Sequence, residues 1–241
     1  DAGQCEGGGD MTMRGLLLDF YGTLVHEDDD VIAGICEQVR MAIPAGPSRP
    51  PADAIGARWW DQFREACATA LGATFVSQRE VGRQSLLATC EEVGATVDVD
   101  ALIAAQFDHW SAPPMFPETP AFLAALRERA LPVCIVSNID RVDIEAAMGT
   151  HGIAVDRVLT SEDVRSYKPN PELFLAGLSA LGLRAGEVLH VGDSRSSDVA
   201  GATALGIPVA WVNRSGKLAS DGPAATHEVA DLTALLPLLG G

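Results

Sequence analysis

An apolar run at residues 16–18 leads directly into Asp19, and the chain then turns through Gly22 and Thr23. An uninterrupted apolar run is typical of a strand that is buried on both faces of a parallel sheet. A carboxylate immediately after such a strand stands at the rim of the sheet, where α/β proteins bind their ligands. Asp19 is therefore a candidate nucleophile. The alternative is that Asp19 only caps a turn, since short Asp-x-x-Gly-Thr strings are common.

Four amphipathic stretches without a convincing strand follow, up to about residue 112. The predicted helices cover residues 31–43, 52–71, 78–93 and 99–110. Ser77 and Glu80 have the spacing of a capping box before the third of these helices, and Gly94 stands where it should end. A proline-rich segment at 113–117 closes the region. The pattern predicts a small helical bundle inserted after the first strand.

Helices and strands alternate beyond this segment. The predicted strands cover residues 132–136, 157–160, 187–191 and 207–212, and the predicted helices cover 120–130, 141–149, 171–181, 197–205 and 231–239. This alternation predicts right-handed crossovers and an α/β fold with a parallel sheet that is covered by helices on both faces.

The composition excludes several classes of partner. The 241 residues carry a formal net charge of −16, which disfavours nucleic acid and anionic membrane surfaces because both need a basic patch. A small anionic substrate remains possible if local cations, backbone N–H groups or a metal hold it. The five cysteines form no Cys-x-x-Cys pair, so we expect no zinc site, no disulfide framework and a cytoplasmic location. No apolar run is long enough to span a bilayer, and residues 1–10 have no signal-peptide pattern.

Polar residues follow two further strands at their carboxyl ends. Ser137 and Asn138 follow the strand predicted at 132–136, and Asp193 follows Gly192 after the strand predicted at 187–191. Either group alone suits a turn or a helix cap. Because the carboxyl ends of parallel strands meet at one edge, we expect these residues and Asp19 to share a site.

The chain resembles the haloacid dehalogenase superfamily in four ordered motifs. They are Asp19-x-Tyr21-Gly22-Thr23, Ser137-Asn138, Lys168-Pro169-x-Pro171-x-x-Phe174, and Gly192-Asp193-Ser194 with Asp198 and Gly201-Ala202 after it. The resemblance implies a Rossmann-like catalytic core at 14–25 and 115–241 and an α-helical cap at 26–114. A flexible tail at 1–13 is expected from the composition of the opening residues, independently of the resemblance. The resemblance also implies that Asp19 attacks the substrate and forms a covalent intermediate that water hydrolyses.

The resemblance also assigns roles to the other motif residues. Lys168, which by itself looks like a solvated loop lysine, would be the second catalytic residue and steady the nucleophile and the transition state. The transferred group would be bound by Tyr21, Gly22, Thr23, Ser137, Asn138 and Lys168. A Mg²⁺ ion would be held by Asp19, the Tyr21 carbonyl, Asp193 and Asp198.

Two chemistries of the family compete for this chain. Most phosphatase members have a proton-donating aspartate where Tyr21 stands, whereas dehalogenase members resemble this chain there. Dehalogenases have serine or asparagine near Asp193 and a tyrosine at the position of Phe174. Because clustered carboxylates suit a metal, the leading prediction is a Mg²⁺-dependent phosphatase acting on a small phosphorylated metabolite. A metal-independent 2-haloacid dehalogenase-type hydrolase is the alternative, and a binding protein on a degenerate core is the lesser one.

A few residues outside the motifs are further candidates. His26 could replace the missing proton donor, or it is an exposed loop histidine. Tyr21 is expected to shape the pocket by packing, because a phenol is a poor acid near neutral pH. In the cap, the residues considered for substrate contact are Arg58, Trp59, Trp60, Arg79 and Arg83. Arg214, after the last strand, is expected to pack in a loop or to reach the substrate.

Overall fold

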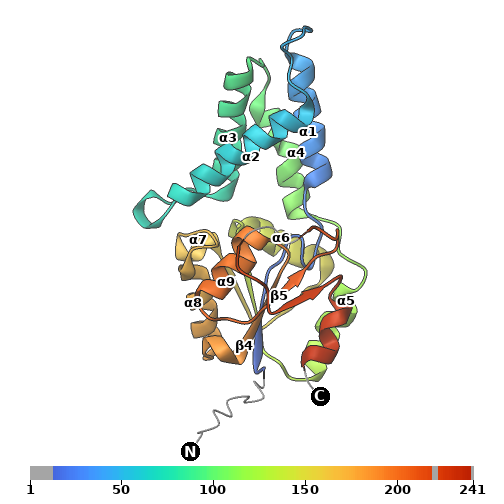
Figure 1. Ribbon diagram of the computed structural model, residues 1–241, viewed down its shortest axis with the longest axis vertical. Coiled ribbons are helices and arrows are strands. Elements are labelled where there is room, and N and C mark those ends of the chain that lie inside the picture. Colours follow the sequence, from blue (N-terminus) through green and yellow to red (C-terminus); the bar gives the residue numbers. More distant parts are fainter. Residues whose placement is uncertain (1–12, 219–221, 240–241) are drawn as a thin grey trace, which may run out of the picture.

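The computed structural model describes residues 13–218 and 222–239, so the predicted tail and Cys5 lie outside the described residues, apart from Met13. Its centre is a six-stranded parallel sheet in the order β3-β2-β1-β4-β5-β6 (Figure 1). The strands are β1 (Gly15–Leu18), β2 (Val133–Ser137), β3 (Arg157–Thr160), β4 (Val188–Gly192), β5 (Val209–Val212) and β6 (His227–Val229). The predicted α/β fold is confirmed.

Strand β1 lies inside the sheet and is buried on both faces. Leu17 pairs with Cys134 of β2 on one side and with His190 of β4 on the other. Leu16 and Leu18 face one hydrophobic cluster and Leu17 faces the other, as the alternation of side chains along a strand requires. This double burial explains why the strand has no polar residue before Asp19.

Helices cover both faces of the sheet. Helices α5 (Thr119–Glu128) and α6 (Arg141–His151) and the 3₁₀ helix η4 (Thr233–Leu239) contribute Phe122, Ile144 and Leu235 to the first cluster. Helices α8 (Pro171–Leu181) and α9 (Ala200–Ala204) contribute Phe174 and Ala202 to the second. Two short helical segments follow β3 and precede β4, namely α7 (Ser161–Val164) and η2 (Ala185–Glu187).

Two predicted helices differ from the structure, and one strand was not predicted. The helix predicted at 197–205 begins as a π-helical turn at Arg195–Val199 and continues as α9. The helix predicted at 231–239 is a 3₁₀ helix, and it contains Pro237, whose missing N–H cannot donate to an α-helical carbonyl. Strand β6 was not predicted because its three residues, with two polar side chains, give no hydrophobic pattern.

Four helices form the bundle that follows the first motif. They are α1 (Asp29–Ala42), α2 (Ala52–Thr69), α3 (Gln78–Val93) and α4 (Val99–Ser111), with the 3₁₀ turn η1 (Gly72–Thr74) after α2. Ser77 accepts a hydrogen bond from Glu80 N at the start of α3, and Gly94 ends α3 in the left-handed region at φ 71°. The bundle buries its own hydrophobic cluster around Ile35, Ile55 and Leu86.

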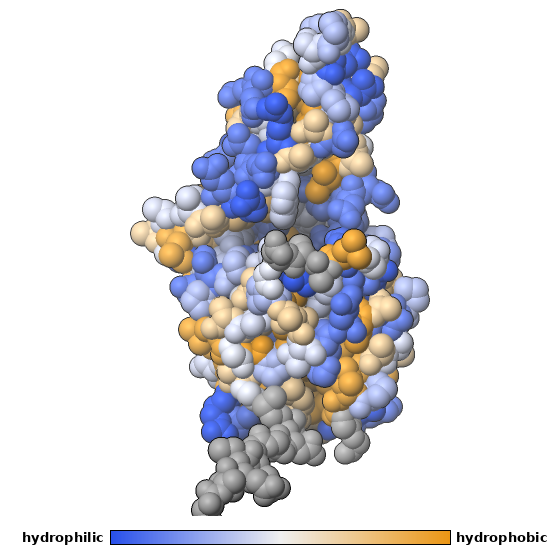
Figure 2. Space-filling view, viewed as in Figure 1, coloured by the Kyte–Doolittle hydropathy of each residue, from blue (hydrophilic) through white to orange (hydrophobic). Residues whose placement is uncertain are grey.

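The bundle stands over the carboxyl ends of the strands, as the inserted cap of the predicted fold (Figure 1). The two chain segments that join it to the core run side by side, with Val25 bridged to Met115. A second contact is far from these connections: Asp140 of the core accepts hydrogen bonds from Gln78 N and Arg79 N at the start of α3. The visible face of the bundle is largely hydrophilic (Figure 2).

The structure also describes four of the five cysteines and the most apolar helices. Cys36, Cys67, Cys90 and Cys134 are free thiols. Among the described residues, no helix combines the length and the apolar character that a membrane span needs.

Candidate active site

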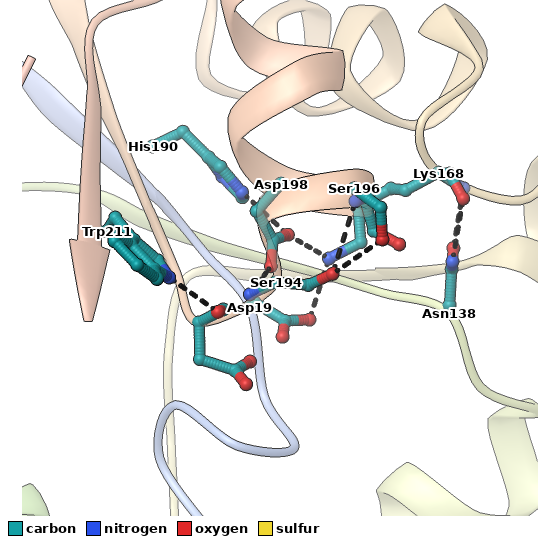
Figure 3. Close-up of polar contacts among 10 residues, drawn as sticks. Asp19, Asn138, Lys168, His190, Ser194, Ser196, Asp198 and Trp211 are labelled. Atoms are coloured by element: carbon teal, nitrogen blue, oxygen red, sulfur yellow. Dashed lines mark hydrogen bonds and ion pairs between the residues drawn. The ribbon is translucent and has the colours of Figure 1, made fainter. Parts of the chain in front are cut away.

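A lysine and two aspartates meet at the carboxyl edge of the sheet (Figure 3). Lys168 Nζ lies 2.7 Å from Oδ1 of Asp19 and 2.7 Å from Oδ1 of Asp198. The side chain of Lys168 is 2% exposed and that of Asp198 is fully buried. The interpretation of Lys168 as a solvated loop lysine is therefore wrong. The lysine of the third motif stands beside the predicted nucleophile.

The charges of this cluster compensate one another. Burial alone would lower the pKa of Lys168, but the negative charges of Asp19 and Asp198 raise that pKa above its ordinary value. Burial raises the pKa of Asp19, and Lys168 opposes the rise. Burial also acts to raise the pKa of Asp198, but Lys168 and the hydrogen bond from His190 hold it below its ordinary range. Lys168 and Asp198 therefore form a buried ion pair at neutral pH.

Asp198 is held by three protein donors. Its Oδ1 accepts from Lys168 Nζ and from His190 Nε2 at 2.9 Å, and its Oδ2 accepts from Ser194 N at 3.0 Å (Figure 3). A Cβ at Gly192 would collide with this carboxyl, so a glycine is needed at the end of β4. His190 was not among the residues predicted from the sequence. The available signal was a histidine within an apolar strand just before a Gly-Asp motif.

Asp193 completes a group of three carboxylates. Oxygens of Asp19, Asp193 and Asp198 all lie within 4.8 Å of one another. Gly22 has a φ of 76°, and a Cβ there would collide with the Asp193 carboxyl. Burial, with added repulsion from Asp19 and Asp198, raises the pKa of Asp193 to about 8. Without a bound cation, Asp193 is therefore mostly protonated at neutral pH, and it adds little negative charge to the site.

This shift predicts a pH-dependent effect of the substitution Asp193→Asn. An unfolded aspartate ionises near pH ~4, so between there and about pH 8 the folded chain retains a proton that the unfolded chain has lost. The stability of the wild type should fall over that interval, because the folded state binds more protons. We expect the free energy of unfolding of the variant to exceed that of the wild type increasingly as the pH rises. Urea unfolding at both ends of the interval measures this, and a constant difference would contradict it.

The residues predicted to bind the transferred group are mostly engaged elsewhere. Asn138 donates to Lys168 O at 3.0 Å and accepts from Lys168 N at 2.7 Å, so its amide fixes the backbone of the lysine. Thr23 is fully buried, and its hydroxyl has no hydrogen-bond partner among the described residues and lies outside the lining of the cleft. Ser137 does line the cleft. Asn138 lines the cleft as well, so Ser137 and Asn138 border the substrate space and Thr23 does not.

Tyr21 is tied to the last turn of the cap. Its hydroxyl donates to Trp110 O at 2.5 Å, and its ring packs edge-on against Phe20. Burial and nearby carboxylates raise the pKa of the Tyr21 phenol above its ordinary value. The expectation that Tyr21 shapes the pocket by packing agrees with this position, and its proton is not available to a leaving group.

A cleft of about 210 Å³ lies between the cap and the core at this site. Its core side contains Asp19, Tyr21, Ser137, Lys168 and Asp193, among others. Its cap side includes Trp59, Trp60, Phe63, Trp110 and Gln106. Asp28, at the join, accepts hydrogen bonds from Gln106 Nε2 at 2.7 Å and Trp110 Nε1 at 2.8 Å.

The cap arginines do not line this cleft. Arg58 pairs with Glu92, Arg83 with Glu80, and Arg79 with the buried Asp143 of α6. The tryptophans that follow Arg58 do line it, and Trp60 is 56% exposed.

Arg214 and His26 also lie outside the lining of the cleft. Arg214 donates to Gly22 O and Thr23 O and pairs with Glu118, so it supports the turn after the nucleophile. His26 is exposed and packs on Phe116.

The sequence of this chain is similar to known proteins. Residues 13–206 match the model of a family described as haloacid dehalogenase-like hydrolase. The chain belongs to this family. It is 29% identical over 231 residues to an (S)-2-haloacid dehalogenase of Pseudomonas sp. strain YL, covering 94% of each chain. It is also 32% identical over 193 residues to a phosphoserine phosphatase of Thermus thermophilus, covering 76% of this chain and 74% of that protein.

Solved structures support the fold of a haloacid dehalogenase-like hydrolase. The crystal structure of an L-2-haloacid dehalogenase matches with a TM-score of 0.78 and 24% identity, covering 95% of this chain and 99% of that chain. At this level of identity the match establishes the fold, and the function has to be argued from the site.

Magnesium, the cofactor predicted for this haloacid dehalogenase-like hydrolase, has two suitable ligands. No described residue donates a hydrogen bond to the Asp193 carboxyl, and Asp19 keeps one oxygen free of Lys168. A bound ion would supply positive charge for an anionic group there. Asp198 fits less well, because both of its oxygens already accept hydrogen bonds from protein donors. That the backbone carbonyl of Tyr21 is a further Mg²⁺ ligand stays a prediction.

Proposed function

We propose that this chain hydrolyses a carbon–halogen bond next to a carbonyl group, through an ester formed on Asp19. The observation that carries the proposal is the Tyr21 hydroxyl, which is committed to Trp110 O at 2.5 Å. A halide leaves as an anion and needs no proton, whereas the alkoxide of a phosphate ester does. The similarity to an (S)-2-haloacid dehalogenase over 94% of both chains supports the same choice.

The proposed reaction has two steps. An Asp19 oxygen attacks the halogen-bearing carbon, a carbon–oxygen bond forms, and the halide leaves with the electrons of the broken bond. Water then hydrolyses the ester, which regenerates Asp19 and releases a hydroxy product and one proton. Lys168 holds Asp19 Oδ1, and this contact orients the carboxylate for attack.

Phosphate-ester hydrolysis is the second candidate. It is favoured by the group of carboxylates within 4.8 Å and by the similarity to a phosphoserine phosphatase. The leading prediction from the sequence counted the aspartates as uncompensated charges that call for a metal. Lys168 and the raised pKa of Asp193 account for most of that charge without a metal.

One assay separates these candidates. A panel of 2-bromo acids and their amides and a generic aryl phosphate are supplied with Mg²⁺ or with EDTA, and halide and phosphate release are measured. We expect halide release that EDTA leaves unchanged, and slower phosphate release. Phosphate release that EDTA abolishes, without halide release, would instead establish the phosphatase.

A further inference from the structure

The side chains that line the cleft differ on the two sides of Asp19. Strand β1, which leads to Asp19, lies between β2 and β4 in the sheet. The segment after β4 adds two carboxyls and two hydroxyls to the lining, those of Asp193, Asp198, Ser194 and Ser197. Among the described residues, the end of β2 adds no carboxyl to the lining, and it contributes Ser137, Asn138 and Ile139. The β2 side is therefore the less acidic place for an anionic group of a substrate.

An anionic group on the β2 side depends largely on neutral hydrogen-bond donors. Lys168 Nζ already donates to Asp19 and Asp198, so its charge is shared and one of its donors remains. The Asn138 amide bonds the Lys168 backbone through both its oxygen and its nitrogen (Figure 3). The Ser137 hydroxyl makes no hydrogen bond to a described residue, so it is open to the cleft. A carboxylate has about four acceptor positions, and one hydroxyl leaves most of them open.

Gln78, the first residue of α3, brings a second neutral polar group to this side from the cap. Its backbone N donates to Oδ1 of Asp140 at 2.8 Å, and Asp140 follows Ser137 closely in the chain. The Gln78 side chain lines the cleft, and its Oε1 is buried without a hydrogen-bond partner among the described residues. A buried amide group without a partner costs about 1–3 kcal/mol, so this side chain is suited to a ligand that completes its hydrogen bonds.

The Gln78 amide can present either a donor or an acceptor to the cleft. No hydrogen bond to a described residue fixes which end of the amide faces the cleft. A bound anion would select the orientation in which Nε2 donates. The backbone bonds from Gln78 N and Arg79 N to Asp140 hold the start of α3 without the help of this side chain. The Gln78 side chain can therefore serve a ligand while the cap stays docked.

We infer that Gln78 binds the carboxylate of a 2-halo acid from the cap, together with the Ser137 hydroxyl, and so determines specificity for the acid group. The inference rests on the proposed function for the halogen and on the lining of the cleft for the acid group. A carboxylate held there lies on the side of Asp19 away from Asp193 and Asp198. Because Gln78 belongs to the cap, recognition of the acid group depends on the docked position of α3.

Binding of propanoate, which has the acid group but no halogen, tests this role without a chemical step. The titration is followed by tryptophan fluorescence, because Trp59, Trp60 and Trp110 line the cleft. We expect Gln78→Leu to weaken binding about tenfold, as the loss of a hydrogen bond to a charged group should. Gln84→Leu, at an exposed position of the same helix, is the matched control and should bind as the wild type does. Absence of propanoate binding to the wild type, or equal binding by Gln78→Leu, would overturn the inference.

A second variant distinguishes direct contact from a structural effect. Gln78→Glu keeps the size of the side chain and replaces the donor by a charged acceptor. It should weaken propanoate binding at least as strongly as Gln78→Leu does, and it should weaken binding of the uncharged propanamide much less, because the new carboxylate repels only the acid. Equal losses for the acid and the amide would indicate a structural role and would also overturn the inference.

Kinetics with 2-bromopropanoate separate this inference from the proposed function. Gln78→Leu should raise KM about tenfold and change kcat much less, because Gln78 contacts the acid group and not the reacting carbon. If halide release proceeds with an unchanged KM, the proposed function stands and the inference fails. If propanoate binding depends on Gln78 but 2-bromopropanoate releases no halide, the proposed chemistry fails and the role of Gln78 in binding the acid stands.

Discussion

Replacing Asp19 by asparagine is expected to lower kcat by at least about a thousandfold while the protein stays folded, because the amide cannot form the ester intermediate. The side chain is buried, and burial raises its pKa, so its charged form is disfavoured in the folded state. A neutral amide of the same size removes that penalty. The melting temperature of Asp19→Asn should therefore equal or exceed that of the wild type. Halide release and thermal unfolding measure the two effects.

The control for this substitution is Asp100→Asn, on the first turn of α4. The Asp100 side chain is 77% exposed and lies outside the lining of the cleft. We expect the variant Asp100→Asn to keep wild-type turnover and to change the free energy of unfolding by less than ~0.5 kcal/mol. If Asp19→Asn kept substantial turnover, another group would have to be the nucleophile.

The sheet edge at which these residues meet was predictable from the sequence. The apolar runs before Asp19 and Asp193 identify buried parallel strands, and the carboxyl ends of such strands lie together. Lys168 was different, since a lysine in a loop carries no local signal of burial. Its place beside Asp19 came only from the resemblance in the third motif.

Contacts between distant parts of the chain were not predictable. Asp28 accepts hydrogen bonds from Gln106 and Trp110, which are 78 and 82 positions away. In the sequence, Asp28 is one of several acidic residues around the start of α1, and this pattern indicates a solvated helix start. Likewise, nothing local indicates that Asp140 caps the start of α3, 61 to 62 positions earlier in the chain. These pairings set the position of the cap, so the lining of the cleft required the structure.

The sequence favoured a phosphatase and the structure favours a dehalogenase, because the charge of a site cannot be counted from sequence alone. Three aspartates near one another predict strong repulsion and hence a metal. In the folded chain, one of them is paired with Lys168 and His190, and Asp193 has a pKa of about 8. Protonation and an ion pair relieve most of the repulsion, and neither depends on local sequence pattern.

Lys168→Met should cause a large loss of stability. The substitution leaves the buried carboxyls of Asp19 and Asp198 without their cation, and breaking a buried pair from one side costs about 3–5 kcal/mol. Urea unfolding measures the free energy. Lys217→Met, on an exposed loop, is the matched control and should stay within ~0.5 kcal/mol of the wild type. Equal losses for the two variants would contradict the buried ion pair.

The double variant Lys168→Met with Asp198→Asn separates the two parts that Lys168 plays. Neutralising Asp198 removes the buried charge that Lys168 compensated, and the Asp198 side chain would still accept from His190, so most of the stability should return. Turnover should not return, because Lys168 also donates to Asp19 Oδ1 and orients the nucleophile. A stable double variant that regained turnover would show that Lys168 serves only to balance charge. A double variant as unstable as Lys168→Met alone would place the stabilising contact on Asp19.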